Sequence, residues 1–332
     1  MKTKPNDTRW NLLSELFRAT SSTWGAAFAL LALVAMIPGA EAAIFTNAAA
    51  GNWSSNATWS NGVAPAINST TNNYIFSLAG GGLSTNDRTG MGFTNFTFGV
   101  GAGAYQISGN SLTNMNGGGI TNLSTSLQSF YVSLILQGAS TMNTASGNLL
   151  IGTNGTNSGT ISGAGTITKT GTGTLILTSS NAFTGGITNN QGTIALSNSF
   201  ALGSGTVTFA SNSTIAALAN NLNLTNAVSI AGSQTATYDN GGFLFTNSSI
   251  MTNTGALVVM GSGTTVFNAA NTFSGGTTIA GGTLRFASSN RLLTNGAVTI
   301  TNGAVLDLGN FTNGLGAITL ASGVITTAPS PT

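Results

Sequence analysis

The chain has 332 residues, of which only 4% are charged and 41% are hydrophobic, and 46 are glycine. The chain has no cysteine, which excludes disulfides, and it has no histidine. Together these two absences remove most metal-binding and nucleophilic arrangements, so we expect no cofactor and no metal. The net charge is +2 and no basic cluster follows residue 42, which excludes a nucleic-acid-binding protein.

The first 42 residues have the three-part organisation of a secretory leader. Residues 1–24 carry four basic side chains, and Gly25–Ile37 is an apolar run that a Pro-Gly pair ends. This run is shorter than the about 20 residues that a membrane span needs, and Ala40–Ala42 has the small-x-small pattern of a cleavage site. We therefore predict a signal peptide over 1–42, cleaved after Ala42 or Ala43. An uncleaved anchor or a short buried helix is the alternative.

Residues 43–160 are expected to form an N-terminal cap and the first turns of the mature fold. Trp53 and Trp59 lie close together here, and Tyr74 follows. We expect these aromatic side chains to be exposed and to cap the first turn. The alternative is that Trp53 and Trp59 stack on sugar rings and form a glycan contact.

Residues 161–325 consist of short segments in which β-branched or aromatic residues alternate with small polar ones. No window has the apolar spacing of a helix. Clusters of Gly, Asn and Ser bound each segment, which is typical of strands of four or five residues. These segments are 166–170, 174–178, 193–196, 206–209, 227–230, 243–246, 256–260, 264–267, 283–286, 297–300, 304–308 and 317–320.

One sixteen-residue phrase occurs twice, at 181–196 and 90 residues later at 271–286. The shared positions include Asn181, Phe183, Gly185, Gly186, Gly192 and Thr193 in the first copy, and Asn271, Phe273, Gly275, Gly276, Gly282 and Thr283 in the second, as well as Thr188 and Thr278. Internal repetition of short strands is the mark of stacked units that bury their apolar faces against one another. We therefore predict an all-β fold, a right-handed parallel β-helix (β-solenoid) with about 20–25 residues per coil and roughly 12–14 coils.

Every position of the phrase has a structural interpretation. Gly275 and Gly276 are expected to make a tight corner with positive φ. Asn271 is expected to bond its own backbone or to stack on an Asn above it. In the strand that follows, Leu284 should point inward and Arg285 outward.

Lys169–Leu196 and Gly261–Phe286 resemble the autotransporter-associated β-strand repeat, also called the passenger-associated transport repeat. The matching features are the KTGxGTL opening, the N-x-F/Y-[ST]-G-G corner and the following GTL strand. Gly51–Pro65 also resembles the entry segment of such exported proteins. The resemblance implies a right-handed β-helical passenger of an exported bacterial protein, in which the repeat assists transport and folding and does not catalyse.

The sequence departs from the family pattern at two points. The middle strand of the first copy, GGITNNQG, lacks the usual apolar residue. The last residues, 326–332, form a linker-like tail, and no membrane barrel of the kind that moves such passengers outward precedes it. Two explanations stay open: the chain continues beyond Thr332, or the repeat is used here without self-transport.

Few side chains in the mature chain can perform chemistry. Glycoside hydrolysis commonly needs two carboxylates close together, and after residue 42 the only acids are Asp87, Asp239 and Asp307. Because they lie far apart in the sequence, we interpret them as surface or turn residues and expect no enzyme. A carbohydrate-active or glycan-binding β-helix is the alternative function.

The surface is expected to be rich in Thr, Ser and Asn and nearly free of charge. Such a surface suits surface glycans or like chains as partners, and it fits display, adhesion or matrix building by a cell-surface, outer-membrane-associated or extracellular protein. Thr-x-Thr segments at Thr166, Thr172 and Thr206 also occur in ice-binding solenoids. Their uneven spacing in the sequence argues against the regular row that ice binding needs.

Overall fold

The computed structural model describes residues 43–292 and 296–327. The predicted signal peptide lies outside these residues. The chain divides into two compact units, Met1–Ala42 and Ala43–Thr332, and the fold described here is that of the second. Within the described residues it consists of short strands and one 3-10 turn, Asn56–Thr58, with no α-helix, as the all-β prediction required.

Three parallel faces make up the fold, and a coil with strands on all three runs through face 3, face 1 and face 2 in that order. Coils at the two ends of the stack have strands on two of the faces. Face 1 is built by β1 (Ile44–Thr46), β3 (Asn72–Phe76), β5 (Met91–Phe98), β7 (Leu112–Asn122), β10 (Ser140–Thr144), β13 (Ile167–Thr170), β16 (Ile187–Asn189), β18 (Val207–Phe209), β21 (Val228–Ile230) and β24 (Met251–Thr252).

Face 2 is a 13-stranded sheet of β2 (Gly51–Asn52), β4 (Gly82–Asn86), β6 (Tyr105–Gly109), β8 (Gln128–Phe130), β11 (Leu149–Ile151), β14 (Thr174–Leu177), β17 (Thr193–Leu196), β19 (Ser213–Ala217), β22 (Thr235–Asp239), β25 (Ala256–Met260), β27 (Thr277–Ile279), β29 (Val298–Thr301) and β31 (Ile318–Ala321). One such strand per coil gives a β-solenoid of about 12 turns. The number of coils therefore agrees with the sequence prediction.

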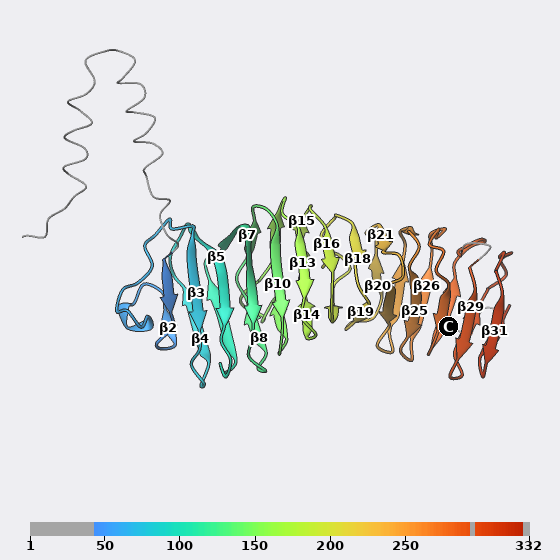
Figure 1. Ribbon diagram of the computed structural model, residues 1–332, viewed down its shortest axis with the longest axis horizontal. Helices are drawn as coiled ribbons and strands as arrows, with labels where there is room; N and C mark the ends of the chain where they lie inside the picture. Colours follow the sequence, from blue (N-terminus) through green and yellow to red (C-terminus); the bar gives the residue numbers. More distant parts are fainter. Residues whose placement is uncertain (1–42, 293–295, 328–332) are drawn as a thin grey trace, which may run out of the picture. The chain divides into compact units, whose positions relative to one another are not determined.

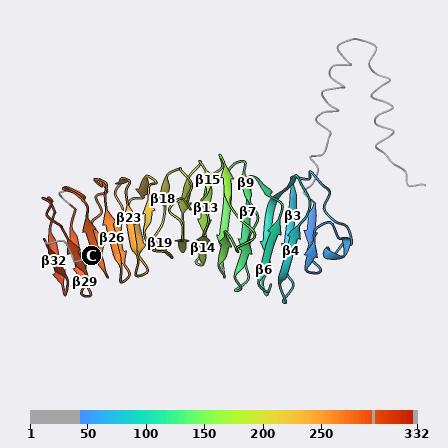
Figure 2. The ribbon, with the colours of Figure 1, turned by 180° about the vertical axis from the view of Figure 1, so that it is seen from behind.

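Face 3 begins with β9 (Leu134–Leu136), β12 (Ile161–Gly163) and β15 (Ala182–Phe183). It continues as a six-stranded sheet of β20 (Leu222–Leu224), β23 (Leu244–Asn247), β26 (Thr264–Phe267), β28 (Thr283–Phe286), β30 (Val305–Asp307) and β32 (Val324–Thr326). Like β15, β20 follows a face 2 strand and precedes a face 1 strand. Figures 1 and 2 show the coils stacked side by side in sequence order, from the blue strands to the red ones.

The parallel register explains why short alternating segments are sufficient for a core. Val207 lies 20 residues after Ile187 and directly above it, and Val228 lies 21 residues further on. All three side chains are buried. A strand alone buries little, but stacking places each inward side chain between the inward side chains of its neighbours. The fold class is thus as predicted, and the right-handed sense of the coil stays a prediction.

Candidate functional site: the repeated coil and its polar side chains

Each copy of the repeated phrase forms most of one coil. The first copy runs through β15, β16 and β17. The second runs through the segment Asn271–Phe273, then β27 and β28.

The repeated asparagines bridge three successive coils. Asn181 accepts a hydrogen bond from the Ile161 backbone N–H at Oδ1 (2.7 Å) and donates from Nδ2 to the Ala201 carbonyl (2.6 Å). Both residues are 20 positions away, in the coils on either side. Because Asn181 is buried, its amide satisfies backbone groups that water does not reach.

Asn271 makes the same bridge in the second copy. Its Oδ1 accepts from the Met251 N–H and its Nδ2 donates to the Arg291 carbonyl, each at 2.9 Å. Nδ2 also donates to the Ala269 carbonyl, two residues away, which is the local backbone bond that the sequence predicted. The alternative, stacking on an Asn of the next coil, is wrong because the amide is already occupied by backbone groups.

The two glycines of each corner are required for different reasons. Gly186 and Gly276 adopt φ of 84° and 86°, where only glycine is comfortable. Gly185 and Gly275 are not in that region, so the prediction of a positive φ at Gly275 is wrong. A Cβ on Gly275 would instead lie 2.4 Å from the carbonyl carbon of Gly255 in the neighbouring coil.

The remaining shared positions shape the strands. Phe183 and Phe273 are buried beside the corners. Gly192 and Gly282 turn the chain with φ of 73° and 60°, and Thr193 and Thr283 open the next strands in parallel register with Thr174 and Thr264.

The last strand of the second copy alternates as predicted. Leu284 is buried in the interior, and Arg285 points outward with 30% of its side chain exposed. The Arg285 Nε donates to Asp307 Oδ2 at 2.9 Å, across to the next strand of face 3.

The two copies nevertheless lie on different faces of the solenoid. Copy 1 occupies faces 3, 1 and 2 in that order, whereas copy 2 starts one face later and occupies faces 1, 2 and 3. Ile187 of copy 1 therefore lies on face 1, and Thr277, its counterpart in copy 2, lies on face 2. The same contacts form on both, so the phrase specifies a coil and its two neighbours rather than one particular face.

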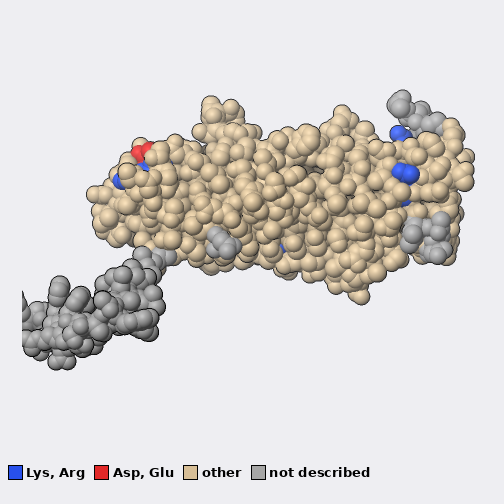
Figure 3. All heavy atoms as spheres, turned by 90° about the horizontal axis from the view of Figure 1, so that it is seen from above, with Lys and Arg blue, Asp and Glu red and all other residues tan. Residues whose placement is uncertain are grey.

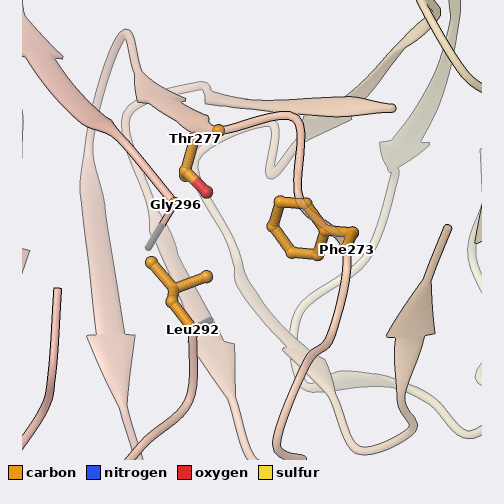
Figure 4. Close-up of a pocket in the computed structure, with 5 residues that line it drawn as sticks. Phe273, Thr277, Leu292 and Gly296 are labelled. Atoms are coloured by element: carbon orange, nitrogen blue, oxygen red, sulfur yellow. The ribbon is translucent and has the colours of Figure 1, made fainter. Parts of the chain in front are cut away.

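A small hollow lies over the second copy. Phe273, Gly276, Thr277, Leu292 and Gly296 line it (Figure 4). These side chains offer an aromatic ring, an aliphatic group and one hydroxyl, and none of them can supply acid–base chemistry near neutral pH.

Lys169 is a buried charged position that the sequence interpretation missed. Its side chain is buried, and its ammonium donates to the Thr170, Gly171 and Gln191 carbonyls at 2.9, 2.7 and 2.8 Å. Burial lowers the pKa of Lys169 to about 8. Strand alternation could have revealed this position, because Ile167 points inward and Lys169 is two residues further along the same strand.

Trp53, Trp59 and Tyr74 are buried, and the prediction that they are exposed is wrong. An antiparallel bridge between Asn47 and Trp59 folds the chain back beside β1, so the Trp59 ring packs edge-on against Trp53 with centroids 5.6 Å apart. Both indole N–H groups have partners, Ser84 Oγ at 2.8 Å and the Trp53 carbonyl at 3.0 Å. No ring face of Trp53 or Trp59 is left for a sugar.

The three acids lie in different coils, each with its own partner. Asp87 accepts a hydrogen bond from the Ser54 N–H (2.8 Å) and another from the Ser54 hydroxyl. Burial opposes ionisation of Asp87, but the Ser54 hydrogen bonds outweigh it and hold its pKa below the usual value. Asp239 accepts from the Gly241 N–H at 2.9 Å. Asp307, interpreted from the sequence as a surface or turn residue, accepts from the Gly309 N–H at 2.9 Å in the turn after β30. It is nevertheless buried and paired with Arg285, so the prediction of a surface position is wrong for Asp307.

Within the described residues, no three His, Cys, Asp or Glu side chains gather where they could hold a metal ion. The described part of the chain also has no helix with the length and hydrophobicity to span a membrane. Figure 3 shows one side of the surface, where coloured, charged side chains are few and most of the described surface is tan.

The passenger-associated-transport-repeat family model matches the chain at residues 167–196 and 257–286. All the shared residues of the repeated phrase fall within these two segments, so the chain carries two passenger-associated transport repeats, as the resemblance implied. No curated protein and no solved structure matches the chain. The repeats and the β-solenoid fit a passenger-like stalk of an autotransporter, a class whose stalks are typically not enzymes.

Proposed function

We propose that this protein is a non-enzymatic passenger stalk of a bacterial cell-surface or secreted protein, and that it is exported to serve in display, adhesion or matrix building. The observation that carries the proposal is the structural use of the repeat. Its asparagines bridge coils, its glycines turn corners and its phenylalanines fill the core. The shared threonines carry only neutral hydroxyls, so no shared side chain offers an acid or a base to a substrate.

A stalk must hold its length without a partner, and the coil contacts support that role. Each coil is joined to its neighbours by parallel ladders on two or three faces and, at the repeats, by buried amide bridges. In a solenoid these contacts recur from one coil to the next, so the stack lengthens coil by coil without needing a single central core.

Export is tested by expressing the full chain with a C-terminal epitope tag and separating the cell fractions. We expect a processed protein outside the cytoplasm whose N-terminus is Ala43 or Ile44. Ala42→Lys should leave the chain unprocessed, because the cleavage pattern needs a small residue there, whereas Ala29→Leu keeps the apolar run and serves as the matched control. An unprocessed wild-type chain in the cytoplasm would contradict export.

The role of the repeat is tested in the same fractions with Asn181→Ala and Asn271→Ala combined. We expect less protein outside and more degradation, because the unbridged coils fold poorly. Equal external amounts of wild type and variant would contradict a role in transport or folding.

Catalysis is tested by a glycan-degradation screen of the wild type alongside Asp239→Ala and Asp307→Ala. We expect no activity from any of the three. Activity that either substitution abolishes would favour the carbohydrate-active alternative.

A further inference from the structure

Face 1 carries an unbroken column of hydroxyl side chains, here called the hydroxyl ladder. Parallel register places one of them on each of six consecutive coils: Thr141, Thr168, Thr188, Thr208, Ser229 and Thr252. Thr141 is exposed, and the other five are partly exposed on strands whose alternate residues are buried. The ladder therefore faces outward.

The ladder is regular although its residues are unevenly spaced in the sequence. Thr141 and Thr168 are 27 residues apart and Thr168 and Thr188 only 20, yet both pairs are direct partners in the sheet. The additional residues lie between the strands, where a protruding antiparallel bridge joins Thr153 and Ser158. The uneven spacing that argued against a regular row is thus absorbed outside face 1.

The chemistry of the ladder is uniform and neutral. No described group of the protein hydrogen-bonds the hydroxyls of Thr168, Thr188 and Thr208, which leaves them free for water. At the end of the ladder, the Thr252 hydroxyl donates to the Val228 carbonyl at 3.2 Å and the Ser229 hydroxyl accepts from Asn253 at 3.4 Å, so the free hydroxyls lie in its middle. The one charged residue on strands β10 to β24 of face 1 is Lys169, whose ammonium is turned inward onto backbone carbonyls. The adjacent outward positions on β10, β13 and after β16 are Asn143, Thr170 and Asn190, which are also polar and uncharged.

A rigid row of this kind matches an ordered water lattice. Neighbouring parallel strands lie about 4.8 Å apart, so the hydroxyls repeat at that distance. Two O–H···O bonds of about 2.75 Å that meet at a tetrahedral angle place the outer oxygens about 4.5 Å apart. The mismatch of about 0.3 Å per coil adds up to about 1.5 Å across the five steps of the ladder, which is less than half of one spacing.

We propose that the hydroxyl ladder is an ice-binding surface. Its hydroxyls anchor a row of waters that continues into the ice lattice, and the threonine methyl groups between them separate the row from bulk water. Charged partners are disfavoured because the ladder offers no charge to complement. Sugar stacking is disfavoured because the ladder carries no aromatic ring.

Face 2 provides a comparison within the same molecule. It also has stacked threonines, among them Thr193 and Thr214, but Val258 interrupts the column. Its adjacent outward positions include Asp239 and the exposed side chain of Met260. A flat lattice of water does not fit over that second column, so ice binding belongs to face 1.

The test is ice affinity of the full chain. Ice is grown slowly from the protein solution, and the fraction of protein incorporated is compared with that of a non-binding control protein. We expect the wild type to be enriched in the ice and Thr188→Lys, in the middle of the ladder, to lower that enrichment at least tenfold. Thr214→Lys on face 2 and Thr246→Lys on face 3 are the matched controls and should behave as wild type.

Circular dichroism and the urea midpoint establish whether each variant is folded. If the charge of Thr188→Lys prevents folding, Thr188→Tyr is used in its place, because tyrosine is favoured in strands. Exclusion of the wild type from ice would overturn the proposal, as would wild-type enrichment of a folded Thr188 variant. Loss of enrichment in the face 2 variant alone would also overturn it. Binding to insoluble cellulose or chitin, with no ice enrichment, would assign the ladder to a glycan instead and overturn ice binding.

Discussion

At the scale of single residues, Lys169 makes the stability of the fold depend on pH. Burial holds its pKa at about 8 in the folded chain, against about 10.4 in an unfolded one. Between these values the unfolded chain binds more protons, so the free energy of unfolding rises with pH. From pH 7 to pH 9.5 we expect a gain of about 2 kcal/mol, measured by urea unfolding.

Lys169→Met should remove this pH-dependent gain. Val259, also buried, occupies the equivalent position of the second copy, so a coil accepts an apolar residue there. Val259→Met is the matched control and should keep the wild-type pH dependence. The measurement stops at pH 9.5 because burial also raises the pKa of Tyr74 and Tyr238, whose titration acts in the opposite direction at higher pH. Identical pH profiles of wild type and Lys169→Met would contradict the assignment.

The amide bridge of Asn271 gives a second prediction at this scale. Asn271→Ala leaves the N–H of buried Met251 without its partner, while the Arg291 carbonyl keeps the Asn271 backbone N–H at 3.3 Å. An orphaned buried polar group costs about 1–3 kcal/mol, so the urea midpoint should fall. Asn268→Ala removes an exposed amide three residues away and should change the stability by less than about 0.5 kcal/mol. Equal effects of the two substitutions would show that the bridge contributes little.

At the scale of elements, the sequence predicts individual coils better than their arrangement. The alternation of residues such as Leu284 and Arg285, and the glycines at the corners, are local, so they could be predicted. The position of copy 2 one face later than copy 1 could not, because it depends on the summed lengths of all the connections between them. The burial of Trp59 and Asp307 depends likewise on partners distant in the sequence, Asn47 and Arg285.

Gly275 provides the prediction for a corner. Its φ suits any residue, but a Cβ would lie 2.4 Å from the Gly255 backbone, so Gly275→Ala must push two coils apart. Gly80 has no positive φ and nothing within 4 Å of an added Cβ, and alanine there should be neutral or stabilise by about 0.4–1 kcal/mol. Thermal unfolding should therefore show a clear loss for Gly275→Ala only. A loss of the same size in both variants would contradict the close-approach argument.

At the scale of the whole solenoid, stability is expected to be unequal along the stack. The coils up to β8 contain a continuous aromatic cluster, in which Phe96 packs 4.9 Å from both Phe76 and Phe130 between ring centroids. Each buried aromatic ring removes about 150–250 Å² from water. On β31, by contrast, Ile318 and Leu320 continue the inward columns of Val298 and Ile300 but are 44% and 54% exposed.

Because each coil contacts only its neighbours, this inequality should appear as a gradient of local opening rather than one global value. Hydrogen exchange of the full chain, resolved by peptide, should show the slowest amides in β5 to β8 and the fastest strand amides in β31 and β32. Phe96→Ala, which removes a fully buried ring and costs about 3–5 kcal/mol, should speed exchange in β3 to β8 and leave β25 to β29 unchanged. Uniform acceleration along all coils would mean that the solenoid opens as a single cooperative unit, and the gradient would then have no basis in nearest-neighbour packing.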